Sequence, residues 1–166
     1  MKKLVVLVVL AALLAPVAIA DDTPQEPQTG MVERALSWLG VRYRFGGQDE
    51  VKGVDCAGLV RRVFSSFAVE LPRTAAAQFR QGCVVERNEL QPGDLVFFKN
   101  TYKRGISHVG IYIGNGEFVH AASSRHAVSV DRLDTPYFAS RFAGGRRVVT
   151  SAALPPLPAA DVLAVN

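Results

Sequence analysis

Residues 106–121 have the sequence ISHVGIYIGNGEFVHA. Apolar residues alternate with small or polar ones before the Gly-Asn-Gly at 114–116, and a second apolar run follows it. Alternation with a period of two residues indicates a half-buried strand, and a glycine-rich segment between two such runs is typical of a hairpin turn. We therefore predict a β-hairpin that carries one histidine on each strand, His108 and His120.

The length of the turn sets the relation between the two histidines. A two-residue turn places them on opposite faces of the hairpin. A three-residue turn at 114–116 pairs Gly110 with His120, so that His108 lies diagonally from His120 on the same face. Gly-Asn-Gly suits three-residue hairpin loops, which need a residue at positive φ. The sequence therefore predicts the second register.

The apolar pattern changes along the chain from a helical period to the two-residue period of strands. Helices are predicted at 32–39, where Gly40 ends the element, from 56 to 67, and between a capping Thr74 and Gly82. Further strands are predicted at 95–98, 128–130 and 147–149. Helices followed by strands predict an α+β fold, with N-terminal helices packed on a mainly antiparallel sheet.

The second predicted helix begins at a cysteine, Cys56, with Asp55 in the position of an N-cap. Its apolar stripe comprises Cys56, Leu59, Val60, Val63, Phe64 and Phe67. Free N–H groups and the helix dipole are expected to lower the pKa of a thiol at this place, and the same N–H groups can hold an oxyanion. The alternative is an ordinary buried cysteine that starts the apolar stripe.

A nucleophilic cysteine needs a base within hydrogen-bond reach and a group that orients the base. The chain has three histidines, and two of them, His108 and His120, are predicted to share a hairpin face. A pair of satisfied core histidines is one alternative. A zinc site with Cys56 is another, although no CxxC or HxxxH spacing accompanies it. His126 follows polar residues 123–125 and is expected in a solvated loop.

The composition fits one globular domain that carries little net charge. The 166 residues are 49% hydrophobic and 20% charged, which allows one sizeable core. The formal charge is +4, of which Lys2 and Lys3 contribute two. No basic stripe is interleaved with aromatic residues, which argues against nucleic acid as a partner. A mildly cationic surface suits a polyanionic polymer such as a cell wall.

The N-terminus has the features of a secretory signal peptide at residues 1–20. Two lysines precede an apolar run, and Ala18-Ile19-Ala20 offers small residues for cleavage. A transmembrane anchor is the alternative, since the apolar stretch from Leu4 to Ala20 has 17 residues. Cleavage predicts an exported protein without a stable membrane anchor, located in the periplasm or otherwise secreted.

The rest of the chain is divided by its composition. Residues 21–30 are polar, with two prolines, and are predicted to form a flexible linker. Residues 31–150 form the predicted domain, and the Pro/Ala-rich residues 151–166 form a flexible tail. Cys56 and Cys83 are the only cysteines, and a disulfide between them is the alternative to a free nucleophile.

The series of motifs in this domain resembles the NlpC/P60 family of cell-wall peptidases. The matching segments are VRYRFGG (41–47), GVDCAGLV (53–60), LPRTAAAQF (71–79), LQPGDLVFF (90–98), ISHVGIYIGNGEFVHA (106–121) and GGRRV (144–148). The resemblance implies a papain-like fold and a cysteine peptidase without cofactor or metal. It also implies hydrolysis of amide bonds in peptidoglycan stem peptides, commonly D-γ-glutamyl–diaminopimelate, and in some members the peptide cross-links.

Carried over by position, the resemblance implies that Cys56 is the nucleophile, His108 the general base and His120 the residue that orients it. Tyr43 corresponds to an active-site tyrosine, and Asp55 to a residue of the substrate cleft. The family usually has serine directly after the nucleophile, where this chain has Ala57. That serine, with the tyrosine and the aspartate, helps some members to hold a free L-Ala amine, so its loss bears on the choice of substrate.

Other roles remain open at the level of sequence. Arg42, Arg44 and Arg73 are candidates to contact substrate carboxylates, and solvated surface charge is the alternative for each. A wall-binding domain without activity is a rival function, although Cys56, His108 and His120 are all present. A papain-like acyltransferase is a second rival. No separate wall-binding module is visible, which leaves targeting to a partner protein as an open alternative.

Overall fold

The computed structural model describes residues 26–148. The predicted signal peptide, most of the predicted linker and the predicted tail lie outside the described residues. Within the part of the chain that the structure describes, no helix combines the length and the apolar character needed to cross a membrane.

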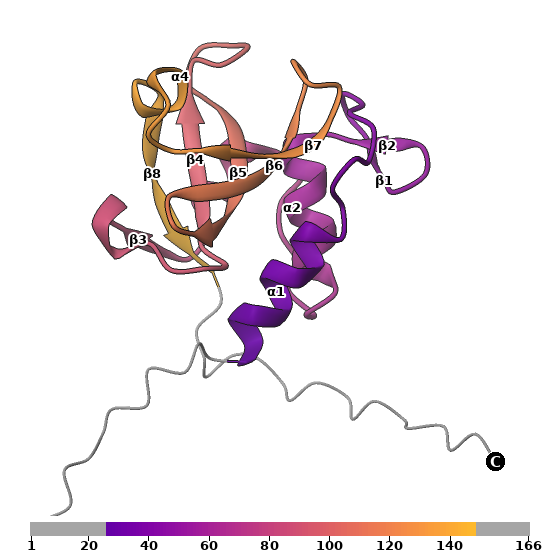
Figure 1. The fold of residues 1–166 in the computed structure, drawn as a ribbon, viewed down its shortest axis with the longest axis horizontal. Coiled ribbons are helices and arrows are strands. Elements are labelled where there is room, and N and C mark those ends of the chain that lie inside the picture. The colour runs from indigo at the N-terminus through magenta and orange to yellow at the C-terminus, as the bar shows by residue number, and fades with distance from the viewer. Residues whose placement is uncertain (1–25, 149–166) are drawn as a thin grey trace, which may run out of the picture.

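A six-stranded antiparallel sheet forms the larger part of the domain (Figure 1). Its strands, in spatial order, are β3 (Cys83–Val85), β8 (Phe142–Arg147), β4 (Leu95–Lys99), β5 (Ile106–Gly114), β6 (Glu117–Ala122) and β7 (Ala127–Arg132). A small separate hairpin comprises β1 (Gln48–Asp49) and β2 (Gly53–Val54). Helices precede the main sheet in the chain, so the predicted α+β class is confirmed.

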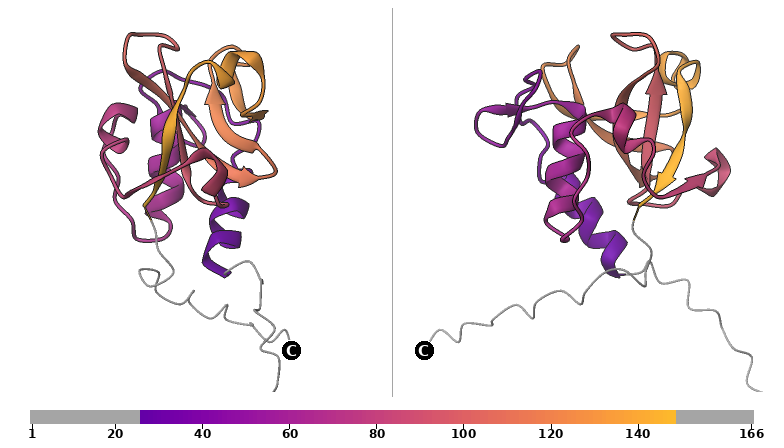
Figure 2. Two further views of the ribbon diagram at one scale, coloured as in Figure 1. Left: turned by 90° about the vertical axis from the view of Figure 1, so that its left-hand side faces the viewer. Right: turned by 180° about the vertical axis from the view of Figure 1, so that it is seen from behind.

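Two helices, α1 (Glu26–Leu36) and α2 (Cys56–Ser65), pack side by side on one face of the sheet (Figure 2). The short helices are α3 (Ala75–Gln78), α4 (Pro136–Ala139) and the 3₁₀ turn Arg87–Glu89. The linker prediction is wrong for residues 26–30, which belong to α1. A proline in the first turn does not prevent this, because the N–H that it lacks would have no helical partner.

The predicted first helix also differs in its end and in its buried face. It stops at Leu36, and turns continue the chain to Gly40. Met31, Ala35 and Trp38 are buried, whereas Leu39 is 47% exposed. Trp38 thus enters the core from the turn after the helix, where it continues the i, i+4, i+7 spacing of Met31 and Ala35 rather than the face predicted from Val32 and Leu39.

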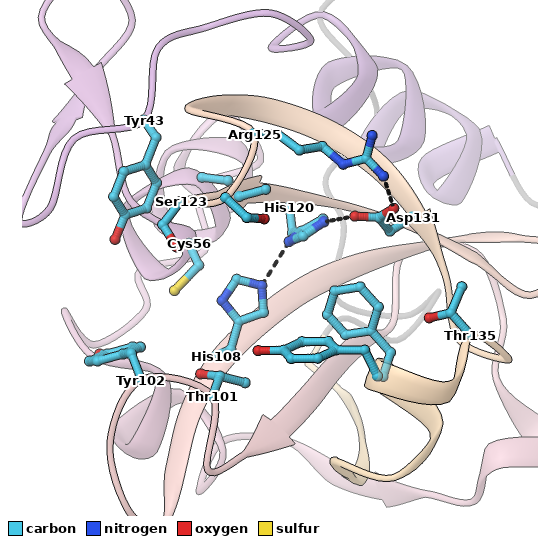
Figure 3. A pocket seen from close by; sticks show the side chains of 15 residues that line it. Tyr43, Cys56, Thr101, Tyr102, His108, His120, Ser123, Arg125, Asp131 and Thr135 are labelled. Carbon is cyan, nitrogen blue, oxygen red and sulfur yellow. Dashed lines mark hydrogen bonds and ion pairs between the residues drawn. The ribbon is translucent and has the colours of Figure 1, made fainter.

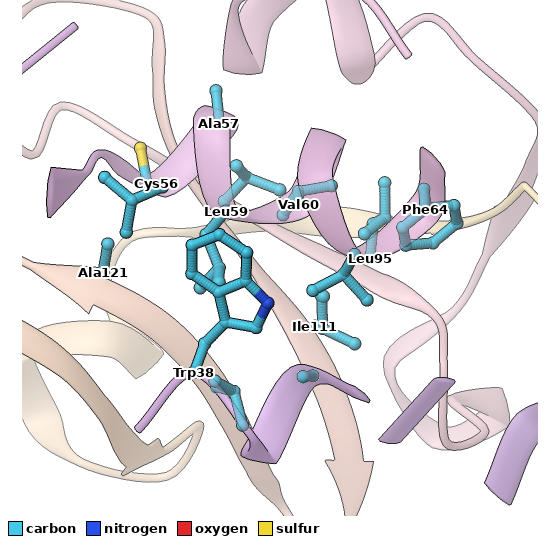
Figure 4. Packing of buried hydrophobic residues seen from close by; sticks show 14 of the residues in the cluster. Trp38, Cys56, Ala57, Leu59, Val60, Phe64, Leu95, Ile111 and Ala121 are labelled. Atoms are coloured by element: carbon cyan, nitrogen blue, oxygen red, sulfur yellow. The ribbon is translucent and has the colours of Figure 1, made fainter. Parts of the chain in front are cut away.

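The main core lies between the helices and the sheet (Figure 4). Leu59, Val60 and Phe64 of α2 are fully buried against Leu95 and Ile111 of the sheet. Each such side chain contributes roughly 1.5–3 kcal/mol through its removal from water. The apolar stripe predicted for this helix therefore fixes α2, and with it the position of Cys56 at the helix start.

A second apolar cluster covers the opposite face of the sheet. It comprises Val96, Phe98, Phe118, Leu133 and Phe138. Phe138 comes from α4, so this short helix closes the face on which the side chains of His108 and His120 lie.

The β5–β6 hairpin has the predicted pairing but a different turn. Ile111 pairs with Val119, which is the register that sets Gly110 opposite His120. Near the turn Gly114 pairs with Glu117, across the two-residue turn at 115–116, and a bulge between Tyr112 and Gly114 takes up the extra residue. The ladder ends at Ile111 and Val119, so both histidines lie beyond its last pair.

Candidate active site

The start of α2 is held by the carboxylate of Asp55. Its Oδ1 accepts a hydrogen bond from the Gly58 N–H at 2.7 Å, as expected of an N-cap. Its Oδ2 accepts one from the Gly46 N–H at 2.9 Å. The same side chain therefore caps the helix and ties down the loop before it.

Arg73 completes the environment of this carboxylate. Its two terminal nitrogens donate to Asp55 Oδ1 at 2.9 Å and Oδ2 at 2.7 Å, a bidentate ion pair. With the two backbone donors, all four acceptor directions of the carboxylate are used. Arg73 is therefore paired within the protein, whereas Arg42 and Arg44, the other candidates to contact substrate, are exposed.

Two glycines allow the loop and α2 to approach each other closely. A Cβ atom at Gly58 would lie 2.2 Å from the Gly47 carbonyl oxygen, and one at Gly47 would lie 2.2 Å from the Gly53 oxygen. Both positions exclude any side chain. The loop carries Tyr43, so this close approach sets where the tyrosine lies relative to Cys56.

A pocket of about 430 Å³ brings the predicted residues together (Figure 3). Its lining includes Tyr43, Cys56, Thr101, Tyr102, His108, His120, Ser123, Arg125, Asp131, Thr135, Tyr137 and Phe138. The Cys56 sulfur points toward the His108 ring. Tyr43 lies beside Cys56, and Tyr102 closes the pocket from the β4–β5 connection.

Cys56 also borders a second hollow, of about 270 Å³. This hollow is lined by Asp55, Ala57 and Arg73, and it shares Cys56 and Tyr102 with the first pocket. The thiol thus lies where two hollows meet. A chain bound across the site would have room on both sides of the sulfur.

The two histidines form the predicted pair and continue into a carboxylate. His108 Nε2 lies 2.8 Å from His120 Nδ1, within a hydrogen bond. His120 Nε2 lies 2.9 Å from Asp131 Oδ2 on β7. Arg125 donates to the other oxygen of Asp131 at 2.5 Å. Sequence reasoning missed Asp131 and Arg125, which extend the pair to a chain of four side chains.

The electrostatics of Cys56 differ from those predicted at a helix N-terminus. Burial, reinforced by the negative charge of Asp55, raises the pKa of the Cys56 thiol from 9.0 to about 11. Burial and the neighbouring His120 lower the pKa of His108 from 6.5 to about 3. The prediction of an acidic thiol is therefore wrong for the free protein. The resting pair is a neutral thiol beside a neutral imidazole.

The order in which the two cysteines react with iodoacetamide tests this state. A pKa of about 11 leaves a thiolate fraction about 100-fold below that of a thiol at 9.0, and the side chain is 7% exposed. Because Cys83 is exposed, we expect it to be alkylated first at mildly acidic pH, as measured by peptide mass spectrometry. The variants Cys56→Ala and Cys83→Ala each leave one thiol and give the separate rates. Faster labelling of Cys56 would instead support the thiol of lowered pKa that the sequence predicts.

The structure also bears on the cysteine pair and on His126. Both cysteines are free, so the alternative of a Cys56–Cys83 disulfide does not occur in this structure. Between residues 26 and 148, no group of three or more His, Cys, Asp or Glu side chains has an arrangement that could hold a metal ion. His126 lies exposed in the turn between β6 and β7, as predicted.

A thiol at a helix N-terminus, facing an imidazole held by an antiparallel sheet, defines a papain-like α+β protein. The model of the NlpC/P60 family matches residues 40–147, which include every candidate residue named above. The chain belongs to the NlpC/P60 family.

Relatives and solved structures agree with this assignment. The chain is 42% identical to the gamma-DL-glutamyl hydrolase of Bacillus subtilis (strain 168) over 78% of its length and 31% of that protein. It is 42% identical to the murein DD-endopeptidase MepS/murein LD-carboxypeptidase of Escherichia coli (strain K12) over 72% of its length and 62% of that protein. A crystal structure of an NlpC/P60 family protein from Bacillus cereus ATCC 10987 matches with a TM-score of 0.70 and 30% identity, over 76% of this chain and 42% of that one. The chain spans less than two thirds of each of these proteins.

Proposed function

We propose that this chain is an exported cysteine endopeptidase that hydrolyses amide bonds in peptidoglycan stem peptides. The observation that carries the proposal is the pocket in which the Cys56 sulfur faces His108, whose ring is hydrogen-bonded to His120. Family membership supports it, as do the names of two relatives, a murein endopeptidase and a glutamyl hydrolase.

The reaction begins with a proton transfer in the neutral pair. His108 takes the proton of Cys56 as the sulfur attacks the substrate carbonyl carbon, so a C–S bond forms and the carbonyl electron pair moves to oxygen. The free N–H groups of the first turn of α2 stabilise this oxyanion. Collapse of the intermediate breaks the C–N bond, and the leaving amine takes the proton from His108.

Hydrolysis of the acyl-enzyme uses the same groups. His108 removes a proton from water, the hydroxyl attacks the thioester carbon, and the C–S bond breaks. The proton returns to Cys56, which restores the neutral pair. His120 keeps the base in place through both halves of the reaction.

The two hollows that meet at Cys56 favour cleavage within a longer chain over removal of a terminal residue. The proposed bonds are D-γ-glutamyl–diaminopimelate or the peptide cross-links. Tyr43, from the first hollow, is the proposed substrate contact beside the nucleophile. Asp55 and Ala57 line the second hollow, where alanine offers no hydroxyl to a substrate amine.

The place of action is proposed from the N-terminus. The signal peptide at residues 1–20 directs export, and the periplasm is the proposed compartment. Peptidoglycan is the proposed partner, and a targeting protein would supply wall binding if this domain has none of its own.

Digestion of purified sacculi tests the function. The wild-type protein is expected to release peptide fragments whose ends carry one added water, as measured by mass spectrometry of muropeptides. Cys56→Ala should release peptides only at a small residual rate, while Cys83→Ala, which removes the exposed thiol, should act as wild type. Equal release by wild type and Cys56→Ala would defeat the proposal. Products that carry an amine or alcohol instead of water would identify an acyltransferase, and binding without release would identify a wall-binding domain.

A further inference from the structure

Asp131 lies at the end of the histidine chain and is ionised. Its side chain is 16% exposed, and its two oxygens accept from His120 Nε2 and from Arg125. The hydrogen bond from His120, followed by that from Arg125, lowers the pKa of this carboxyl below 3.8. An ionised carboxylate can only accept hydrogen bonds. The nitrogen that faces it, His120 Nε2, must therefore carry a hydrogen.

The position of the hydrogen on His120 also determines the position of the hydrogen on His108. With both rings neutral, each imidazole carries one N–H, so a hydrogen on His120 Nε2 leaves a lone pair on Nδ1. That lone pair faces His108 Nε2 at 2.8 Å, which must then be the donor. The single hydrogen of His108 is thus on Nε2, and its Nδ1 keeps a lone pair. The Cys56 sulfur faces this ring in the pocket (Figure 3).

We propose that Asp131 is a positioning residue that selects the tautomer of both imidazoles and so presents the basic nitrogen of His108 to Cys56. The proposal rests on the proposed function for its catalytic meaning, but the tautomers themselves are independent of it. Arg125 serves by holding the carboxylate. Without a fixed acceptor at this place, each ring could carry its hydrogen on either nitrogen.

Among the groups around His120, Asp131 determines which ring nitrogen carries the hydrogen. Its side chain is 3% exposed, and the ring of His120 packs on the aromatic rings of Phe118 and Phe138 at centroid distances of 4.8 and 5.4 Å. Among the described side chains, its hydrogen-bond partners are His108 and Asp131 alone. His108 is itself neutral and can donate or accept, so it does not determine which nitrogen of His120 carries the hydrogen.

Asp131→Asn is expected to exchange the donor and acceptor roles in the hydrogen bonds that join residue 131, His120 and His108. The amide oxygen of the new side chain would face the Arg125 donor, and its NH₂ group would face His120 Nε2. That nitrogen would then accept, His120 Nδ1 would donate to His108, and His108 Nδ1 would present a hydrogen to the sulfur. An amide in place of the triad carboxylate lowers kcat about 10⁴-fold in serine proteases for the same reason. We expect kcat for peptide release to fall between about 10²- and 10⁴-fold, with KM unchanged.

Nitrogen-15 NMR of the histidine rings reads the tautomers directly. In the wild type we expect both His108 and His120 to carry their hydrogen on Nε2, and in Asp131→Asn on Nδ1. The matched control is Asp134→Asn, the same change in an exposed Arg132–Asp134 ion pair near the end of β7. It should leave both spectra and kcat as in the wild type.

The outcomes separate this proposal from the proposed function. A wild-type spectrum with the hydrogen on His108 Nδ1 would overturn it without any variant, even if Asp131→Asn failed to fold. Loss of activity in Asp131→Asn with unchanged tautomers would reduce Asp131 to a structural residue and overturn it as well. If Cys56→Ala released as much peptide as wild type while the tautomers were as expected, the proposed function alone would fail.

Discussion

Replacing His108 with alanine is expected to lower kcat for peptide release by about 10⁴-fold or more. The Cys56 thiol has a pKa of about 11, so at neutral pH it needs a base to take its proton during attack. His108 is the imidazole that the sulfur faces, and its lowered pKa keeps it unprotonated and available. In a hydrolytic triad, loss of the base alone costs almost as much as loss of the whole triad.

A double variant tests whether the two groups act as a unit. We expect Cys56→Ala/His108→Ala to be no slower than Cys56→Ala, since without the thiol the base has no proton to take. The matched control is His126→Ala, a histidine in an exposed turn, which should retain wild-type kcat. If the losses of Cys56→Ala and His108→Ala multiplied in the double variant, the two side chains would act independently and the proposed mechanism would be wrong.

The pairing of the histidines could be predicted because it depends on local chemistry. Gly-Asn-Gly and the alternating apolar residues specify the register that sets Gly110 opposite His120. The form of the turn could not be predicted, because a two-residue turn with a bulge and a three-residue turn give the same pairing farther along the strands. Face and register are thus more predictable than the turn that produces them.

Asp131 was missed because its position depends on a second register. His120 pairs with Ser129, so Asp131 lies diagonally from His120 on the same face of the sheet. The polar turn at 123–126 contains no glycine that would have indicated this pairing. Alternation with the apolar Val128 and Val130 places Asp131 on the polar face, but only the paired strands bring it to His120.

The pKa of Cys56 shows how burial outweighs a helix terminus. The sequence predicts the N-terminal position correctly, and a helix dipole contributes about 0.3–1 kcal/mol. Removal of the sulfur from water and the adjacent charge of Asp55 act in the opposite direction, and both depend on tertiary packing. The helix-terminus rule therefore predicts the position of Cys56 correctly and its protonation state wrongly.

Asp55→Ala is expected to lower the free energy of unfolding by about 2–3 kcal/mol. Loss of the helix N-cap costs about 1 kcal/mol. The rest comes from Arg73, which would lose its charged partner at a site where 32% of its side chain is exposed, so solvent screens part of the cost. Urea unfolding measures the change.

Asp55→Asn separates the two contributions, because asparagine caps a helix about as well as aspartate. It keeps an oxygen for the Gly58 N–H but removes the charge opposite Arg73, and its NH₂ group meets a donor. We expect a loss of about 1–2 kcal/mol, while Arg73→Met should cost less, because two backbone N–H groups still hold Asp55. Asp134→Asn, in an exposed ion pair, should change stability by less than about 0.5 kcal/mol. If Asp55→Asn cost no more than that control, the charge opposite Arg73 would not contribute to stability, and the whole loss in Asp55→Ala would come from the helix cap.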